Sequence, residues 1–546
     1  MNEQKKKNNF VLQAGILAAS GMIVKVIGLI YRSPLLSIIG LEGNGYYSTA
    51  INIYTIILLI SSYSIPSAIS KVIAQKLAFK EYRNAQRIFR CALLYVLVVG
   101  GVASIITFAA APLFMRTSVN SIVALRVLAP TIFFSGFLGV FRGYFQAHGS
   151  MLHTSLSQIL EQILNAAVSI GAAYLLIGMV ADQSETTQAI YGSAGSALGT
   201  GAGVVIALLF MLGMYMLNRR MINRRAEHDR TGKQDSYGEI FKQIFTIVTP
   251  FILSTFIYNC STVVNMYIYL NILIDFKKLD SVAAHIDYGI FSTQAVAVVN
   301  IPIAIASAMS SATIPGVSTS FVREEYRKTK QQVSKAIHMT MLIAIPASVG
   351  LLLLAQPVMH FIFPQKDSLE QASGLLAALS VTVILYCLST LTNAVLQGIG
   401  KVNTPVIHSV IALVIQVAGL VAMLWYTDLN LYALVCANII YSLVMCILNQ
   451  ISVRKHLGYK QELIKTFIIP FISSLLMGVV AYGVYYGLYK IIPVSRVVLL
   501  IAIGIGAIVY FVLILLLGGV NERELKSFPK GAMLVHFAKK MHLLKR

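Results

Sequence analysis

Charged side chains are scarce in this chain. They make up 12% of its 546 residues, whereas soluble domains carry about 25%. Hydrophobic residues make up 57% of the chain, and the mean hydropathy is +0.76. A chain with so little charge cannot cover a water-exposed surface, so we expect a polytopic, all-α integral membrane protein.

Cysteines are few, and their positions exclude a disulfide framework. The five lie singly in apolar segments without metal-ligand spacing: Cys91, Cys260, Cys387, Cys436 and Cys446. The histidines His148, His153, His338 and His408 lie near the ends of apolar segments, so we interpret them as interfacial side chains. We therefore expect no metal site and no cofactor.

Motifs of nucleotide and covalent chemistry are missing. There is no Walker motif, and no nucleophile stands beside a candidate base. The glycine-rich run 199–203 lies inside an apolar segment, where Gly195, Gly199 and Gly203 form a ridge of small residues suited to helix packing. The sequence therefore predicts that the protein is not an enzyme.

Apolar segments long enough to cross a bilayer, about 20 residues each, occur fourteen times. They are 10–39, 44–69, 89–115, 121–145, 151–180, 189–217, 244–272, 287–318, 337–363, 371–397, 405–426, 430–451, 464–489 and 496–519. An even number of spans predicts that both termini lie on one side of the membrane.

The basic residues predict which side that is. With the N-terminus in the cytoplasm, the segments on that side hold 34 of the 43 Lys and Arg residues, and the outer loops hold six. This asymmetry is what the positive-inside rule requires. The net charge of +22 is therefore expected to face anionic lipid, and nucleic acid is not expected as a partner.

Short matches suggest that six spans are repeated. Gln146-Ala147-His148-Gly149 and Gln397-Gly398-Ile399-Gly400 follow the fourth and tenth spans, and Tyr47-Ser48-Thr49 matches Phe291-Ser292-Thr293. Two parallel copies imply a pseudo-two-fold axis along the membrane normal. The predicted parts are a six-helix lobe (1–217), a basic linker (218–243), a second six-helix lobe (244–451), two extra helices (452–519) and a basic tail (520–546).

The first span carries an unusual stripe. At 100° per residue, one helix face combines small residues with two cations: Ala14, Ala18, Gly21, Lys25, Gly28 and Arg32. A cation within a membrane helix costs about 2.5–3.5 kcal/mol on insertion scales. In one interpretation Lys25 pairs with a carboxylate and the side chain of Arg32 extends to the membrane interface. In the other, both side chains line a cavity, and this interpretation predicts that the cavity binds an anion.

The fifth span carries a second polar stripe. Its members recur at helical spacing: Thr154, Gln158, Glu161, Gln162 and Asn165. Glu161 either balances Lys25 or another internal cation, or is a titratable, ion-coupling group in a cavity. The seventh span repeats the pattern without charge, ending at Asn265, and such residues often form interhelical hydrogen bonds.

Prolines interrupt two spans. Pro66 lies near the end of the second span, and Pro302 and Pro315 lie in the eighth. Each removes a backbone donor and lets a helix bend. Bent helices would suit an alternating-access transporter.

Together these features resemble a known superfamily. The resemblance rests on the cationic first helix and on three segments: Phe141-Arg142-Gly143-Tyr144-Phe145-Gln146, Ser157-Gln158-Ile159-Leu160-Glu161-Gln162 and Leu396-Gln397-Gly398-Ile399-Gly400-Lys401. They resemble the polysaccharide branch of the multidrug/oligosaccharidyl-lipid/polysaccharide exporters. Within it the chain is most similar to stage V sporulation protein B and MurJ-type flippases.

The resemblance implies two six-helix lobes around a central cavity, plus two C-terminal helices. It also implies that an undecaprenyl-diphosphate-linked sugar precursor crosses the bacterial cytoplasmic membrane, with Lys25 and Arg32 against the diphosphate. Asn265 stands where that branch leads us to expect Asp. The expected driving force is the membrane potential or a gradient of H⁺ or Na⁺, and cell-wall synthesis proteins are expected partners.

Two other functions remain open. A cation-coupled drug antiporter of the same superfamily would need acidic residues facing the cavity. A scaffold for wall synthesis that transports nothing would not need the cavity at all. The sign of the charge around the cavity separates the flippase from the antiporter.

Overall fold

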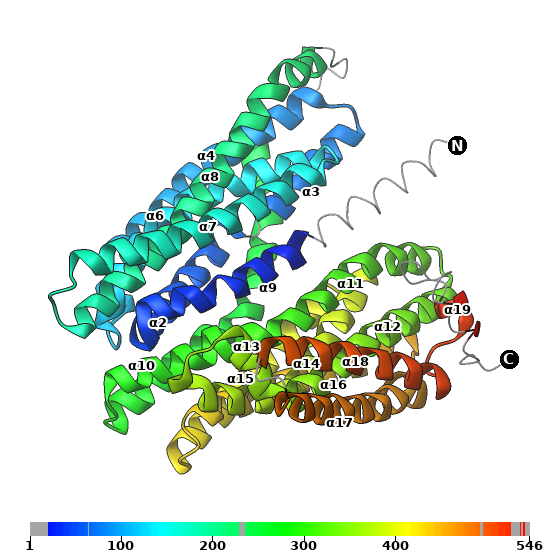
Figure 1. Cartoon of the computed structure of the whole chain (residues 1–546). Helices are drawn as coiled ribbons and strands as arrows, with labels where there is room; N and C mark the ends of the chain where they lie inside the picture. The colour runs from blue at the N-terminus through cyan, green and yellow to red at the C-terminus, as the bar shows by residue number, and fades with distance from the viewer. Residues whose placement is uncertain are drawn as a thin grey trace. The chain divides into compact units, whose positions relative to one another are not determined.

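The structure is a computed structural model. It describes residues 20–63, 65–227, 229, 235–491, 495–525, 535–536 and 539–540. Helices of α, 3₁₀ and π type make up all the regular structure in these residues (Figure 1). The chain forms two compact units, the first comprising 1–293 with 420–431 and the second comprising 294–419 with 432–546.

The first unit opens with a helix at Ser20–Ile30, referred to below as the first helix. The elements that follow are α2 (Arg32–Leu58), η1 (Leu59–Tyr63), α3 (Ile65–Ala78), α4 (Tyr82–Ala109), α5 (Ala111–Phe114), η2 (Val119–Ser121), α6 (Ile122–Ala147), α7 (Met151–Met179), α8 (Glu185–Glu227), α9 (Tyr237–Asn271), η3 (Ile272–Phe276), α10 (Ser281–Gly289) and η4 (Ile290–Ala295). The last two residues of η4 belong to the second unit.

The predicted first span, 10–39, is not one straight helix, although the predicted stripe of small and basic residues requires one. The chain bends by 47° between the first helix and α2. Pro34 explains the bend, because it cannot donate to the carbonyl of Ile30 and its ring clashes with that carbonyl. Arg32 therefore begins a new helix and does not continue the face of Lys25. Ala14 and Ala18 lie outside the described residues.

The ridge of small residues predicted in the sixth span is confirmed. A methyl group on Gly195 would lie 2.5 Å from the backbone of Ala173, and one on Gly203 would lie 2.5 Å from the carbonyl oxygen of Glu161. The backbones of α7 and α8 thus approach closely along this ridge. The run 199–203 is a packing surface for α7, as the sequence predicts.

The second unit contains the remaining helices. They are α11 (Val296–Val322), α12 (Tyr326–Leu353), α13 (Ala355–Ile362), α14 (Lys366–Gly398), α15 (Asn403–Tyr426), α16 (Leu431–Leu457), η5 (Ile464–Ile468), α17 (Ile469–Tyr489), α18 (Ser495–Leu516) and α19 (Glu522–Leu525). Residues 420–426 of α15 and Leu431 of α16 belong to the first unit.

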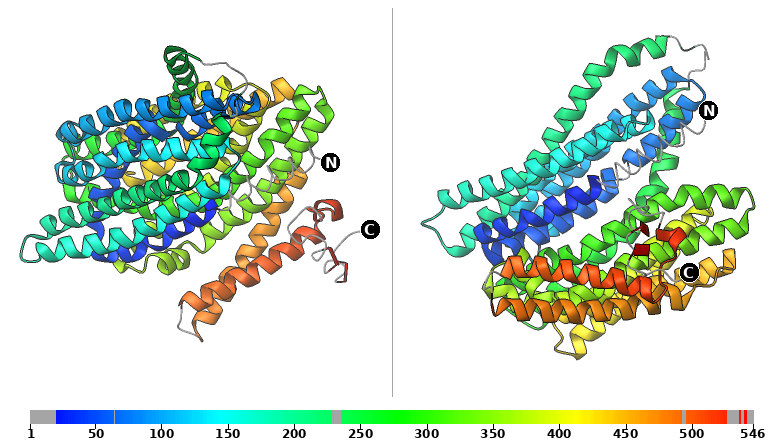
Figure 2. Two further views of the ribbon diagram at one scale, coloured as in Figure 1. Left: turned by 90° about the horizontal axis from the view of Figure 1, so that it is seen from above. Right: turned by 45° about the vertical axis from the view of Figure 1, so that its right-hand side comes forward.

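The two helices outside the repeat, α17 and α18, lie side by side (Figure 2). They also pack on α12. Tyr510 donates to the carbonyl oxygen of Leu342 at 3.0 Å. A methyl group on Gly478 would lie 2.5 Å from the side chain of Leu353. These contacts make α17 and α18 part of the second unit.

Two helix ends have the same capping geometry. Helix α6 ends where Gly149 has φ +76°, and α14 ends where Gly400 has φ +80°. In both places the next residue donates back to the helix, Ser150 to Phe145 at 3.0 Å and Lys401 to Leu396 at 2.9 Å. Glycine suits this left-handed C-terminal cap because it has no Cβ. The Gln-x-x-Gly match in the sequence therefore encodes the same turn twice.

A second pair of corners repeats in the same way. Lys80 before α4 has φ +61°, and Glu324 before α12 has φ +59°. The next residues, Glu81 and Glu325, precede two helices of 28 residues each. Two non-glycine residues thus share this uncommon conformation before helices of equal length. The repeat and its lobes at 1–217 and 244–451 stay a prediction.

Eleven helices in the described part of the chain are long and apolar enough to cross a membrane, or twelve if the first helix and α2 form one bent span. The chain is therefore an all-α, multi-pass membrane protein. Fourteen spans stay a prediction.

Candidate functional site

The first helix and α7 bring the two predicted stripes together. Ser20 donates to Gln158 Oε1 at 3.5 Å. A methyl group on Gly28 would lie 3.0 Å from Gln162 Nε2. The small residue thus leaves room for a glutamine amide against the first helix. Gln158 and Gln162 face the helix that carries Lys25.

Lys25 makes no hydrogen bond or ion pair with any residue that the structure describes. Its side chain lies on an exposed part of the first helix. An ammonium group needs water, an anion or an acceptor to compensate its charge inside a membrane. Lys25 therefore has its charge available for a ligand within the described part of the first unit.

Arg32 contacts the backbone of η4. Its Nη1 donates to the carbonyl oxygen of Thr293 at 3.3 Å. The hydroxyl of Thr293 also accepts from Asn44 at 2.7 Å. Arg32 is half-buried. Among the described residues it makes one long hydrogen bond, which leaves most of its five N–H donors available to another acceptor.

Glu161 is paired with Arg142. Arg142 Nη2 lies 2.7 Å from Glu161 Oε2, and Arg142 Nε donates to Ser157 at 2.9 Å. The side chains are 14% and 30% exposed, so the pair is largely shielded from solvent. Of the two interpretations of Glu161, the one in which it balances an internal cation matches this contact, with Arg142 as the partner.

Arg142 is a site residue that the charge pattern of the sequence did not single out, because it lies near the cytoplasmic end of a predicted span. The signal was present in the spacing. Arg142 lies five residues before the end of α6 and Glu161 ten residues after the start of α7, at about 7.5 and 15 Å along antiparallel helices. A long arginine side chain can cover that difference in depth.

The other two polar residues do not join this group. Asn165 accepts from Ser169 at 2.9 Å, and a methyl group on Gly203 of α8 would lie 3.1 Å from its Cβ. Asn165 therefore lies at the α7–α8 contact. Asn265 lies buried on α9, and its Oδ1 has no hydrogen-bond partner in the described part of the protein. Asn165 and Asn265 remain predictions as cavity residues.

The three prolines lie in different settings. Pro66 is the second residue of α3 and lies three residues after the end of the π-helix η1. Pro302 is buried in α11, where its carbonyl oxygen is 3.9 Å from Cys387 Sγ. The side chain of Pro315 lies outside the described residues. Their role in helix bending stays a prediction, and α6 and α12 contain two further internal prolines, Pro130 and Pro346.

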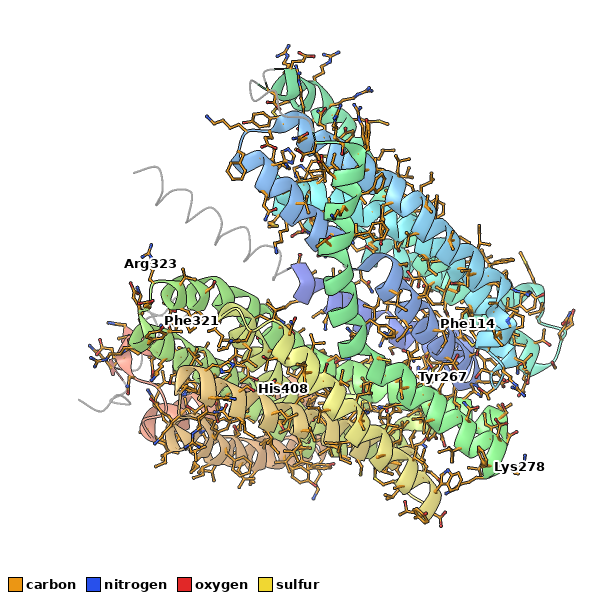
Figure 3. The ribbon with its side chains drawn as sticks, turned by 180° about the vertical axis from the view of Figure 1, so that it is seen from behind. Phe114, Tyr267, Lys278, Phe321, Arg323 and His408 are labelled. Carbon is orange, nitrogen blue, oxygen red and sulfur yellow. The ribbon has the colours of Figure 1, made fainter. Side chains whose placement is uncertain are left out.

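Two of the histidines interpreted as interfacial are buried instead. His338 is 3% exposed and His408 is 8% exposed. His408 Nδ1 lies 2.7 Å from Asn449 Oδ1, and its Nε2 lies 3.2 Å from Ser452. Asn449 also donates to Asn393 at 2.7 Å. His408, labelled in Figure 3, thus joins α14, α15 and α16 in a polar network, and span-end position alone did not reveal this burial.

Contacts also attach α9 to the first unit. Tyr267 donates to the carbonyl oxygen of Phe114 at 2.5 Å, and the two are labelled in Figure 3. Asn52 of α2 donates to Tyr288 of α10 at 2.9 Å. Both α9 and α10 are therefore compact with α2 to α8, although the repeat assigns them to its second copy.

The sequence of this chain matches one protein family and two curated relatives over most of its length. The family model described as Lipid II flippase MurJ matches residues 72–501. The chain is 24% identical over 540 residues to the Lipid II flippase MurJ of Bacillus subtilis (strain 168), which covers 93% of this chain and 95% of the relative. It is 22% identical over 536 residues to Stage V sporulation protein B of the same organism, covering 96% and 98%.

The fold also matches a solved structure. The inward-facing conformation of a multidrug resistance MATE family transporter of the MOP superfamily aligns with a TM-score of 0.64. The alignment covers 82% of this chain and 98% of that chain, at 19% sequence identity. The chain therefore has a MATE-like fold.

Proposed function

The chain belongs to the MurJ family of lipid II flippases, and we propose that it carries an undecaprenyl-diphosphate-linked sugar precursor across the cytoplasmic membrane. The precursor is lipid II or a polysaccharide repeat unit. Movement is by alternating access, in a protein with fourteen spans, two six-helix lobes, two extra helices and both termini in the cytoplasm.

One observation carries the proposal. Lys25 has no partner in the described part of the chain, while the carboxylate on the facing helix, Glu161, is neutralised by Arg142 at 2.7 Å. The excess charge of this region is therefore positive, from Lys25 and Arg32. A diphosphate supplies the opposite charge and several acceptor oxygens, which suit ammonium and guanidinium donors.

The membrane potential favours the outward direction. Moving a negative charge out of an inside-negative cell releases about 2.3 kcal/mol per charge per 100 mV. This energy acts on the headgroup and needs no nucleotide. Coupling to H⁺ or Na⁺ would add to it.

The antiporter remains the alternative, because the aligned structure with TM-score 0.64 is a multidrug transporter. An organic cation needs a free carboxylate in the cavity. Glu161 is held by Arg142, which favours an anionic substrate. Uptake of a cationic dye against a proton or sodium gradient would instead support the antiporter.

The test is flipping in proteoliposomes with a fluorescent undecaprenyl-diphosphate oligosaccharide. The Lys25→Gln/Arg32→Gln double variant should lose at least nine tenths of the flipping rate while inserting normally. Arg126→Gln is the matched control, because it removes a membrane-span cation that lies over the Phe108 ring, 5.6 Å from its centroid. Equal rates for the double variant and the wild type would overturn the proposal.

A further inference from the structure

The Arg142–Glu161 ion pair borders the face of α7 that meets the first helix. Glu161 comes three residues after Gln158 and one residue before Gln162, so the three side chains lie within about 100° of one another around α7. Both glutamines lie against the first helix, which carries Lys25. The polar face of α7 thus has the first helix on one side and Arg142 of α6 on the other.

Arg142 has hydrogen-bond donors to spare. A guanidinium group presents five N–H donors in a planar fork. Nε of Arg142 donates to Ser157 at 2.9 Å, and Nη2 donates to Glu161 Oε2 at 2.7 Å. These are its only hydrogen bonds to residues that the structure describes. The same fork binds phosphate as well as carboxylate, often through two parallel bonds, so a diphosphate is a suitable alternative partner.

The two partners are not held equally well. The side chain of Arg142 is 14% exposed, and that of Glu161 is 30% exposed. Arg142 is also fixed by Ser157, which is buried and donates its hydroxyl to the carbonyl oxygen of Thr154 at 2.7 Å. The carboxylate of Glu161 has no second hydrogen bond to a described residue. Glu161 can therefore turn away while Arg142 stays in place.

An anionic ligand competes with Glu161 for Arg142. A diphosphate carries more negative charge and more acceptor oxygens than one carboxylate. The partial exposure of Glu161 lets water solvate the displaced carboxylate, which lowers the cost of separating the pair. A carrier must release its ligand as well as bind it, and a carboxylate beside the arginine supplies the competitor that release requires.

We propose that Arg142 is a further ligand of the anion and that Glu161 is its internal counterion. The diphosphate displaces Glu161 from Arg142 on binding, and Glu161 takes Arg142 back on release. The inference rests on the proposed function, to which it adds a third cation beside Lys25 and Arg32 and a release step.

Binding of undecaprenyl diphosphate, measured by native mass spectrometry, tests both roles. Glu161→Gln should bind at least threefold more tightly than the wild type, because no carboxylate competes for Arg142. Arg142→Gln/Glu161→Gln should bind at least threefold more weakly than the wild type, although both have the same net charge at this place. Equal affinity of this double variant and the wild type would show a purely structural pair and overturn the inference.

The matched control is a carboxylate in another ion pair. Glu524 pairs with Lys465 at 2.7 Å, and both lie in the second unit. Glu524→Gln makes the same change of net charge, and its affinity should match that of the wild type. A gain as large as that of Glu161→Gln would show that net charge alone sets the affinity, and the counterion role would fail.

The flipping rate tests the release step. In proteoliposomes with saturating lipid, Glu161→Gln should flip at least threefold more slowly than the wild type, because the bound diphosphate lacks its competitor. Tighter binding together with slower turnover is the expected combination. A rate equal to or above that of the wild type would contradict the exchange of partners at Arg142.

Inorganic pyrophosphate separates this inference from the proposed function, because it carries the diphosphate without lipid or sugar. In detergent it should raise the melting temperature of the wild type, and that of Arg142→Gln/Glu161→Gln less than half as much. Equal shifts, or no shift of the wild type, would overturn the role of Arg142. If the wild type binds pyrophosphate but no undecaprenyl diphosphate, the proposed function fails and the two pyrophosphate shifts decide about Arg142.

Discussion

At the scale of single residues, the arrangement depends on which charges are compensated. Glu161 and Arg142 neutralise each other across α6 and α7. Arg32 is held by one backbone carbonyl. Lys25 has no partner in the part of the chain that the structure describes. The uncompensated charge among these four described residues is therefore positive, because the only carboxylate of the group, Glu161, is paired with Arg142.

Removing one member of the Arg142–Glu161 pair should destabilise the protein. Arg142→Gln leaves a carboxylate in a largely shielded place, so we expect the free energy of unfolding to fall by about 1–3 kcal/mol. The Arg142→Gln/Glu161→Gln double variant should recover part of this loss, because no unpaired charge remains. Thermal unfolding in detergent measures both, and equal melting temperatures for the single variant and the wild type would contradict the pairing.

At the scale of helices, much of the architecture follows from sequence pattern. The ridge of Gly195, Gly199 and Gly203 and the paired turns at Gly149 and Gly400 depend on local spacing, so they could be predicted. The bend at Tyr31 could have been predicted from Pro34 and was not. The close contact of α2 and α10 at Gly45 and Gly289, where a methyl group on Gly289 would lie 2.9 Å from Gly45 Cα, could not be predicted. Two helices distant in sequence meet there, and neither glycine stands out alone.

The glycine ridge makes a prediction about helix packing. Gly203→Ala should destabilise the α7–α8 contact by about 1–3 kcal/mol, because its Cβ would meet backbone at 2.5 Å. Gly213→Ala on the same helix is the matched control, with open space around its Cβ, and should be neutral or slightly stabilising. In thermal unfolding, Gly213→Ala should have a melting temperature equal to or above that of the wild type, and Gly203→Ala should have the lowest. A melting temperature of Gly203→Ala above that of Gly213→Ala would refute the packing role.

The corner between α3 and α4 makes a prediction about pH. Lys76 bridges Glu81 at 3.0 Å and Asp235 at 2.5 Å. The hydrogen bond from Asn84 and the charge of Lys76 hold the pKa of Glu81 below its ordinary value. Burial opposes the charge of Lys76, but hydrogen bonds to Asp235 and Glu81 outweigh it and raise the pKa of Lys76. These groups attach the start of α9 to the corner.

The sign of each effect follows from linkage. The contribution of Glu81 is present above its unfolded pKa of about 4.3 and is lost as pH falls through the lowered value. The contribution of Lys76 is present below about pH 10.4 and is lost as pH rises through the raised value. Hydrogen exchange at the start of α9 should therefore be slow near pH 7. It should become faster in Lys76→Gln at that pH, and an unchanged rate in this variant would contradict the attachment.

At the scale of the whole molecule, the charge asymmetry predicts orientation. In a cysteine-free background, Ser184→Cys should react with an impermeant maleimide added outside intact cells. Arg323→Cys, at the exposed corner labelled in Figure 3, should react only after the membrane is opened. Labelling of Arg323→Cys from outside would reverse the predicted topology.

The proposed function depends on one property of the molecule, a positive region that binds a lipid diphosphate. Binding of undecaprenyl diphosphate without its sugar, measured by native mass spectrometry, tests this most directly. The wild type should bind it at least tenfold more tightly than Lys25→Gln/Arg32→Gln, a difference of about 1.4 kcal/mol, and Arg126→Gln should match the wild type. Equal affinity of the double variant and the wild type would contradict the account.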